Sequence, residues 1–231
     1  MEIDMIKINE KYAAFCQRRL MDAPDAHPAW GRLRDLGLKR PDGPDDSSAV
    51  WRFGLGLALP TAEDIRNWAL AEVTAADDRE LVVSELSRLA NRILMPAREV
   101  TGDVVGFSAR IMPGSTSPGK YVNSRETPTF QKRQIVYGLD VLAAQGSGKR
   151  TLQIYEGQVD VWRAYEAGSR SAVCAPLSPE GAAKLVPYAA KAVLRFEDSR
   201  FSQRMCAKAR QWLESAGVPC ELGDPLADVR M

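Results

Sequence analysis

The stretch Leu152-Gln153-Ile154-Tyr155-Glu156-Gly157-Gln158-Val159-Asp160 decides the fold of this 231-residue chain. Its apolar first half predicts a β-strand that ends just before Glu156. The apolar residues after Asp160, with Gly168 as a stop signal, predict a helix over residues 158–167 that packs back on the strand. Glu156 and Asp160 are therefore expected to face one crevice.

Two interpretations of this carboxylate pair follow from the residues. Open α/β sheets hold ligands at the carboxyl ends of their parallel strands, and paired carboxylate oxygens there suit Mg²⁺. Alternatively, Glu156 is a solvated loop residue or a charge that complements a helix N-terminus. The stretch by itself leaves both interpretations open.

Strand and helix patterns alternate from residue 149 to near the end of the chain. The predicted strands cover residues 152–155, 172–175, 192–196 and 218–222, and the predicted helices cover residues 158–167, 179–190 and 203–216. Such alternation indicates a parallel sheet with right-handed crossovers. Since parallel strands share one carboxyl edge, that edge is expected to gather Glu156, Glu197, Asp198 and Asp224.

The earlier part of the chain mixes helices and strands. Helices are predicted over residues 9–21, 28–36 and 79–89 and after the capping box at 61–64, and strands over residues 92–95 and 104–110. Residues 113–119 and 120–133 are predicted to be loops. Gly146-Ser147-Gly148 is the predicted joint. The expected fold class is α/β, with an α+β part over residues 1–148 and a parallel-sheet α/β subdomain over residues 149–231.

Charge is distributed unevenly, although the formal net charge is only +1. Residues 88–150 carry ten Lys or Arg against four Asp or Glu, whereas residues 21–87 carry seven against thirteen, which gives +6 beside −6. A basic face of this kind can bind nucleic acid even when the whole protein is nearly neutral. A solvated surface with no ligand explains the same count equally well.

The cysteine and histidine content excludes a zinc ribbon. The chain has four cysteines without a C-x-x-C pair, and its one histidine, His27, precedes Pro28 and has no catalytic partner in the sequence. There is no signal-peptide pattern and no apolar run of about eighteen residues. The sequence therefore predicts a cytoplasmic protein with reduced, packed thiols and no membrane association.

Five segments resemble, in order and spacing, the motifs of the catalytic core of bacterial DnaG-type DNA primases, whose second half is a Toprim domain. They are RLANRILMPARE (residues 88–99), VVGFSAR (104–110), KYVNSRETPTFQK (120–132), YGL (137–139) and YEGQVDV (155–161). The last segment is similar to the Toprim signature V-E-G-x-x-D-V. The resemblance covers most of the chain and is weaker over the helical residues from about position 8.

This resemblance implies synthesis of short RNA primers from ribonucleotides on a single-stranded DNA template, with Mg²⁺ or Mn²⁺ as cofactor. It implies that Glu156 orients metal ions or acts in proton transfer and that Asp160 supports the same site. Further metal ligands are expected among Glu197, Asp198 and Asp224. Contacts to phosphates are expected from a largely basic set: Arg92, Arg98, Arg110, Lys120, Asn123, Lys132 and Arg133.

The chain also departs from the family pattern. The family's F-D-G-D-R-A-G turn aligns with residues 196–202, so that Glu197 stands for the first Asp and Ser199 for the second. The family's D-P-D aligns with residues 224–226, where Leu226 replaces the last carboxylate, and Asp228 is the nearest substitute. The family's zinc-binding and helicase-binding modules are not recognised in this sequence. A separate helicase or zinc-module chain is therefore an expected partner.

Two hypotheses about function remain open from the sequence. One is a compact, diverged primase core that makes primers. The other is a catalytically weakened or inactive primase-like protein that binds DNA or regulates a replication system. The two lost carboxylates favour the second hypothesis, while Glu156, Asp160 and the 120–132 segment favour the first. A Toprim nuclease or topoisomerase is a weaker alternative, because the basic segment resembles that of primases.

Overall fold

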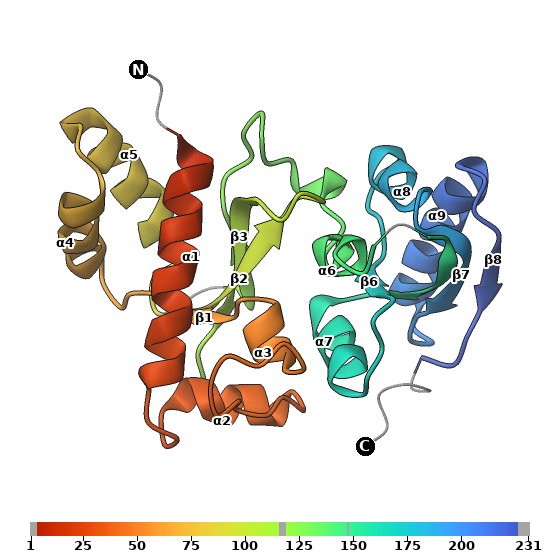
Figure 1. Cartoon of the computed structure of the whole chain (residues 1–231), viewed down its shortest axis with the longest axis horizontal. Helices are drawn as coiled ribbons and strands as arrows, with labels where there is room; N and C mark the ends of the chain where they lie inside the picture. The colour runs from red at the N-terminus through yellow and green to blue at the C-terminus, as the bar shows by residue number, and fades with distance from the viewer. Residues whose placement is uncertain (1–3, 116–118, 147, 226–231) are drawn as a thin grey trace. The chain divides into compact units, whose positions relative to one another are not determined.

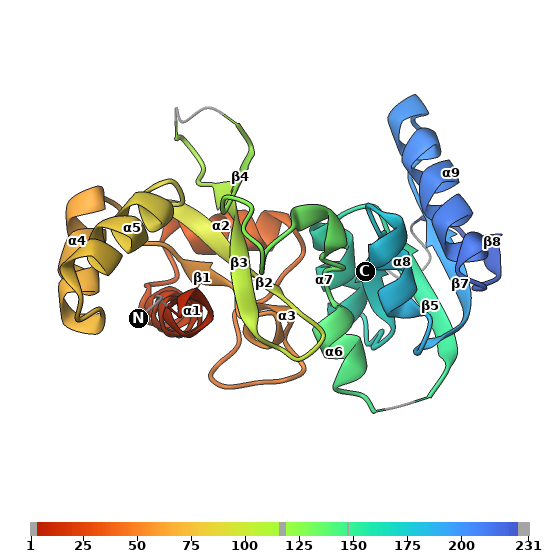
Figure 2. The same ribbon diagram turned by 90° about the horizontal axis from the view of Figure 1, so that it is seen from above.

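The computed structural model describes residues 4–115, 119–146 and 148–225. The chain forms two compact units, and most of their helices and strands are labelled in Figures 1 and 2. Unit 1 comprises the described residues of Met1–Asp45, Val50–Ala97 and Asp103–Thr129, and unit 2 those of Asp46–Ala49, Arg98–Gly102 and Phe130–Met231. The division into functional parts after residue 148 stays a prediction.

Unit 1 combines helices with an antiparallel sheet. Its elements are α1 (Met5–Asp22), α2 (Pro28–Asp35), α3 (Ala49–Arg52), β1 (Gly56–Leu57), α4 (Ala62–Glu72), α5 (Ala76–Ser87), β2 (Arg92–Arg98), β3 (Val104–Ile111) and β4 (Tyr121–Asn123). The strand order is β1-β2-β3-β4, with antiparallel pairing of β1 with β2 and of β3 with β4. The prediction of a loop over residues 120–133 is wrong for Tyr121–Asn123, because these three residues are too few to show an alternating pattern.

The core of unit 1 is organised around a buried tyrosine of α1. The ring centroid of Tyr12 lies 4.9 Å from that of Trp68 and 6.0 Å from that of Phe107, both in edge-to-face geometry. The Tyr12 hydroxyl accepts a hydrogen bond from the backbone N–H of Leu59 at 3.2 Å. Burial raises the pKa of the Tyr12 phenol and raises that of the neighbouring Cys16 thiol to about 12, so both stay neutral.

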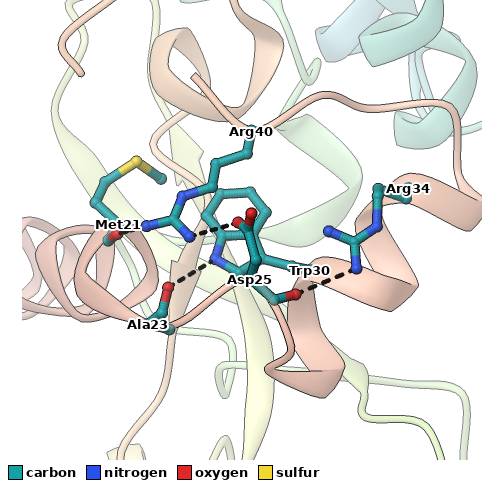
Figure 3. A network of polar contacts seen from close by, with 6 residues as sticks. All are labelled: Met21, Ala23, Asp25, Trp30, Arg34 and Arg40. Atoms are coloured by element: carbon teal, nitrogen blue, oxygen red, sulfur yellow. Dashed lines mark hydrogen bonds and ion pairs between the residues drawn. The ribbon is translucent and has the colours of Figure 1, made fainter. Parts of the chain in front are cut away.

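A second network, shown in Figure 3, connects the end of α1 to α2. The buried Trp30 donates its indole N–H to the carbonyl of Ala23 at 3.3 Å. The Arg40 guanidinium lies 5.1 Å from the Trp30 ring centroid and bonds Oδ1 of Asp25 at 2.7 Å and the carbonyl of Met21 at 2.6 Å. A cation above an indole face and three polar contacts thus fix the chain direction between the two helices.

Unit 2 is a parallel α/β unit. Its elements are η1 (Lys132–Gln134), α6 (Leu139–Ala143), β5 (Arg150–Tyr155), α7 (Gln158–Glu166), β6 (Ala172–Cys174), α8 (Pro179–Leu185), β7 (Ala189–Arg195), α9 (Arg200–Ser215) and β8 (Cys220–Leu222). The strand order is β6-β5-β7-β8, and every neighbouring pair is parallel. The parallel α/β prediction is therefore confirmed. Figure 2 shows α9 beside β7 and β8 at one side of this unit.

The earlier segments that belong to unit 2 are tied to it by polar contacts. The backbone N–H of Ala49 donates to the Glu166 carboxylate at 2.8 Å, and Lys184 bonds both oxygens of Glu99 at 2.8 and 2.9 Å.

Among the described residues, no helix has the length and apolar character needed to span a membrane. All four cysteines are free thiols.

One predicted helix of unit 2 is too long. A helix was expected over residues 179–190, but α8 ends at Leu185 and β7 begins at Ala189. Pro187 has no backbone N–H with which to continue the helix. Ala189 then pairs with Arg150 of β5, which extends the strand three residues before its predicted start at residue 192.

The close approach of α1 to β1 in unit 1 generates a stability prediction. A Cβ atom added at Gly56 would lie 2.8 Å from the carbonyl carbon and Cβ of Cys16, so that α1 or β1 must move. We expect Gly56→Ala to lower the free energy of unfolding by about 1–3 kcal/mol, as overpacking usually does. Urea unfolding followed by circular dichroism measures this difference.

Gly43→Ala is the matched control for Gly56→Ala. No atom lies within 4 Å of an added Cβ at Gly43, and its backbone is not in the left-handed region. The control should unfold within about 0.5 kcal/mol of the parent. Equal destabilisation by the two substitutions would contradict the contact between α1 and β1.

Candidate metal centre and nucleic-acid interface

The strand order of unit 2 determines where the predicted carboxylates lie. The chain passes from β5 to β6 on one side and then returns to β7 on the other side of β5. With right-handed crossovers, α7 covers one face of the sheet while α8 and α9 cover the other. The loops after β5 and β7 therefore diverge at the carboxyl edge of the sheet, where α/β sheets commonly bind ligands.

The register of β5 with β7 brings Glu156 and Glu197 to this edge. Tyr155 pairs with Arg195, so Glu156 follows directly after the last pair on one strand and Glu197 comes two residues after it on the other. Asp160 lies in the first turn of α7, a helix that begins at Gln158, shortly after the end of β5 at Tyr155. Three carboxylates from the predicted metal set thus share one edge of unit 2.

The electrostatics of Asp160 show that these carboxylates influence one another. Partial burial raises the pKa of Asp160 above its ordinary value, and the Glu197 and Glu156 carboxylates add to the increase. Arg163 opposes it through an ion pair of 3.7 Å between Nη1 and Oδ1. The side chain of Asp160 is 37% exposed, so water and ions can reach it. The cluster therefore carries repulsion between like charges that a cation would relieve.

In the turn after β7, two side chains at positions of the family's F-D-G-D-R-A-G turn form hydrogen bonds with α9. Ser199 is the N-cap of α9, and its hydroxyl accepts from the backbone N–H of Ser202 at 3.1 Å. Asp198 accepts from Nε2 of Gln203 at 2.6 Å, and both Glu197 and Asp198 line a cavity of about 380 Å³ between α9 and β8. Ser199 thus begins a helix, and Asp198 is held by α9.

Sequence reasoning missed an arginine that organises the same edge. Arg195 donates from Nε to the side-chain oxygen of Gln153 at 2.6 Å and from Nη1 to the backbone carbonyl of Asp224 at 2.5 Å. It thereby links β5, β7 and the residues after β8, including the predicted ligand Asp224. Leu226 and Asp228, considered in the sequence comparison, lie outside the described residues.

The carboxylates do not form a complete metal site by themselves. Within residues 4–115, 119–146 and 148–225, no three His, Cys, Asp or Glu side chains lie close enough together to hold an ion. Their hard oxygen atoms and mutual repulsion nevertheless fit a divalent cation that takes further ligands from substrate phosphates and water. Mg²⁺ usually binds in this way, with one or two carboxylates from the protein.

In unit 1, the β3–β4 ribbon carries the most organised part of the predicted basic set. Arg110 pairs with Tyr121 across the two strands, and its guanidinium lies 5.1 Å from the Tyr121 ring centroid while donating to the tyrosine hydroxyl. Lys120 lies on the same ring, with Nζ 5.8 Å from the centroid. Tyr121 is 37% exposed, so two cations surround an accessible aromatic ring.

Other members of the set differ in how accessible they are. Arg92 is only 4% exposed and donates to the carbonyl of Gly119 at 3.2 Å, and Asn123 is half-buried in β4. In unit 2, Arg98 donates to the carbonyl of Gly102 at 2.6 Å, whereas Lys132 and Arg133 of η1 are exposed. The structure therefore divides the predicted residues between the two units, and their contacts with phosphate stay predictions.

Comparison with known proteins finds similarity to DNA primases, in agreement with the sequence motifs. Residues 46–143 match the family model for the N-terminal domain of the DNA primase catalytic core. The chain is 29% identical over 227 residues to the DNA primase of Enterococcus faecalis, which covers 91% of this chain and 35% of that protein. It spans about a third of the length of several such curated relatives.

Solved structures establish the likeness of the fold. The E. coli primase catalytic core superimposes with a TM-score of 0.78 at 20% identity, covering 97% of this chain and 74% of that one. A DnaG primase catalytic domain bound to single-stranded DNA gives a TM-score of 0.77 at 21% identity, covering 95% of this chain and 70% of that one. The matched domain and the sequence relatives show that the chain is similar to the catalytic core of bacterial DnaG-type DNA primases, and the solved structures show that it shares the fold of that core.

Proposed function

We propose that this chain catalyses the synthesis of RNA primers on single-stranded DNA by metal-dependent nucleotidyl transfer. The observation that carries the proposal is the position of Glu156, Asp160 and Glu197 at one carboxyl edge of a parallel sheet, where the charges of Glu197 and Glu156 act on Asp160. The related proteins named DNA primase support the reaction, and the relative bound to single-stranded DNA supports the template.

One or two carboxylates of the set Glu156, Asp160 and Glu197 would hold Mg²⁺ or Mn²⁺, together with substrate phosphates and water, and Asp198 and Asp224 are further candidates. A bound divalent ion would supply positive charge against the phosphates of a ribonucleotide. Glu156 is half-buried between β5 and α7. Its carboxylate would bind the metal ion or accept a proton. Arg195 acts as a positioning residue, since it fixes the backbone of Asp224.

The basic residues would hold the template and the incoming nucleotide. Lys120 and Tyr121 are exposed on the β3–β4 ribbon, and Lys132 and Arg133 are exposed on η1. Exposed cations bind phosphates without first breaking an internal hydrogen bond, so these residues are the strongest candidates. Arg92, Arg98 and Arg110 already donate to groups of the protein and would act mainly by holding the loops that carry the binding residues.

The second candidate function is nucleic-acid binding without efficient catalysis. It is favoured by Ser199, whose hydroxyl begins α9 at the position where the family has a carboxylate. In either case, the zinc-binding module and the module that binds a helicase would be supplied by a separate chain or by sequence outside these residues. Primer synthesis by the purified chain distinguishes the two functions.

The repulsion within the carboxylate cluster yields a prediction about stability. A carboxyl group whose pKa is raised on folding binds more protons in the native state than in the unfolded state between the two pKa values, so its effect destabilises the protein as pH rises. We expect Asp160→Asn to raise the melting temperature at pH 7 in EDTA, and the gain to shrink as pH falls toward the ordinary Asp pKa of about 4.

Mg²⁺ provides the control for this stability effect. Added Mg²⁺ should raise the melting temperature of the parent more than that of Asp160→Asn, because the variant has less charge to neutralise. A variant that melts below the parent in EDTA at pH 7 would mean that the ion pair with Arg163 outweighs burial and repulsion. Differential scanning calorimetry measures both effects.

The role of Glu156 is tested by primer synthesis. The assay contains single-stranded DNA, radiolabelled ribonucleotides and either Mg²⁺ or Mn²⁺. We expect Glu156→Gln to reduce primer yield at least about 100-fold, since it keeps the shape of the side chain and removes its charge. Full yield in the variant places the reaction elsewhere, and no primer from the folded parent with either metal ion supports the binding function.

The basic ribbon is tested through the salt dependence of binding. Each lysine that neutralises a phosphate of single-stranded DNA contributes about 0.7 to the slope of log affinity against log salt. We therefore expect Lys120→Gln to reduce the slope by about 0.7 in fluorescence anisotropy. Lys11→Gln is the matched control, because Lys11 lies in the same unit and is paired with Glu72 at 2.8 Å. Equal slopes for Lys120→Gln and the parent would remove Lys120 from the interface.

A further inference from the structure

The solvent-facing side of α9 carries an aromatic ring among unpaired cations. Phe201 is 67% exposed, although phenylalanine is normally buried. Arg200, Arg204 and Lys208 of the same helix are also exposed. None of them belongs to the basic segment at residues 88–150 or to the carboxylate cluster. This group, called the α9 stripe below, therefore needs its own explanation.

Helix periodicity places the α9 stripe on one side. The buried residues Ser202, Cys206, Ala209 and Leu213 recur at spacings of three and four and form the side that faces the sheet. Phe201, Arg204 and Lys208 stand at i, i+3 and i+7, so they share a different side. At a rise of 1.5 Å per residue they span about 10 Å, which is roughly three phosphates of a nucleic-acid strand at 3.4 Å each.

The positive charge of the stripe is not neutralised within the described chain. Arg210, on another side of α9, bonds Glu214 at 2.8 Å. By contrast, no ion pair links Arg200, Arg204 or Lys208 to any residue that the structure describes. Three cations without a carboxylate partner form a local positive surface that complements a polyanion.

The exposed ring narrows the choice of polyanion. A duplex hides the faces of its bases in the stack, whereas a single strand can place an unpaired base on an aromatic side chain while cations follow its backbone. The stripe also begins at Arg200, three residues after Glu197 at the carboxyl edge of the sheet. A strand held there would therefore run along α9 from the edge that carries the catalytic carboxylates.

We propose that the α9 stripe is a second binding surface for single-stranded nucleic acid, on which Phe201 stacks with one base and Arg200, Arg204 and Lys208 contact phosphates. The inference rests on the proposed function only in taking the template or the primer as the strand concerned. Binding itself requires no catalysis and can be measured in its absence.

The first experiment measures the affinity of a fluorescein-labelled 12-nucleotide single strand in EDTA, without nucleotides, in the Glu156→Gln background. We expect Phe201→Leu to weaken binding about 5- to 100-fold and Phe201→Tyr to restore most of it, since only the aromatic face stacks. Arg204→Gln and Lys208→Gln should each lower the salt slope by about 0.7. Arg210→Gln, whose parent charge is already paired with Glu214, is the matched control and should lower it less.

The second experiment locates the contact directly. The same oligonucleotide carrying 5-iodouracil is irradiated with the protein, and the cross-linked peptide is identified by mass spectrometry; a cross-link to Phe201 is the expected result. Affinity unchanged by Phe201→Leu, with no cross-link within residues 200–208, overturns the proposal even if the chain makes primers. Conversely, no primer synthesis by the folded parent, together with weaker binding by Phe201→Leu and a cross-link to Phe201, would overturn the catalytic function and support the α9 surface.

Discussion

The parallel pairing of β5 with β7 is the interaction on which the site depends. Its register sets Tyr155 opposite Arg195, and the two strands then send their following helices to opposite faces of the sheet. A shift of two residues along either strand would separate Glu156 from Glu197 by about 6–7 Å more. Backbone hydrogen bonds within the sheet, rather than contacts between the carboxylates, hold these like charges together.

Much of unit 2 could be predicted because its signals are local. The apolar run before Glu156 and the alternation of strands and helices are visible in the sequence, and they predict the parallel sheet. The strand order β6-β5-β7-β8 was not predicted, and α9 begins at Arg200, three residues before its predicted start. Arg195 could not be recognised as a positioning residue, since its partners Gln153 and Asp224 lie 42 and 29 residues away. From the sequence, Phe201 was placed in the turn over residues 196–202, so the position of this ring on the exposed side of α9 was not predicted.

Unit 1 was less predictable, and the reason is strand length. β1 has two residues and β4 has three, so neither shows an alternating pattern, yet both pair with long neighbours. The serine of the 120–132 segment shows how tertiary structure supplies the missing information. Ser124 accepts the backbone N–H of Phe107 on its hydroxyl at 2.9 Å and donates its own N–H to the carbonyl of Phe107 at 2.9 Å. Ser124, which lies in one of the five motif segments, thus also ends the pairing of β3 with β4.

At position 199, the start of a helix and the binding of a metal ion place different demands on the side chain. Serine and aspartate cap helices about equally well, so the start of α9 gives no reason to prefer serine over the family's carboxylate. The electrostatics of this edge do give one. Burial raises the pKa of Asp160, the charges of Glu197 and Glu156 add to the increase, and another negative charge next to Glu197 would add further repulsion. A smaller carboxylate set is less costly to fold without metal, but it leaves more of the coordination to substrate phosphates. Metal binding in this chain should then depend on nucleotide more strongly than in a relative that keeps all its carboxylates.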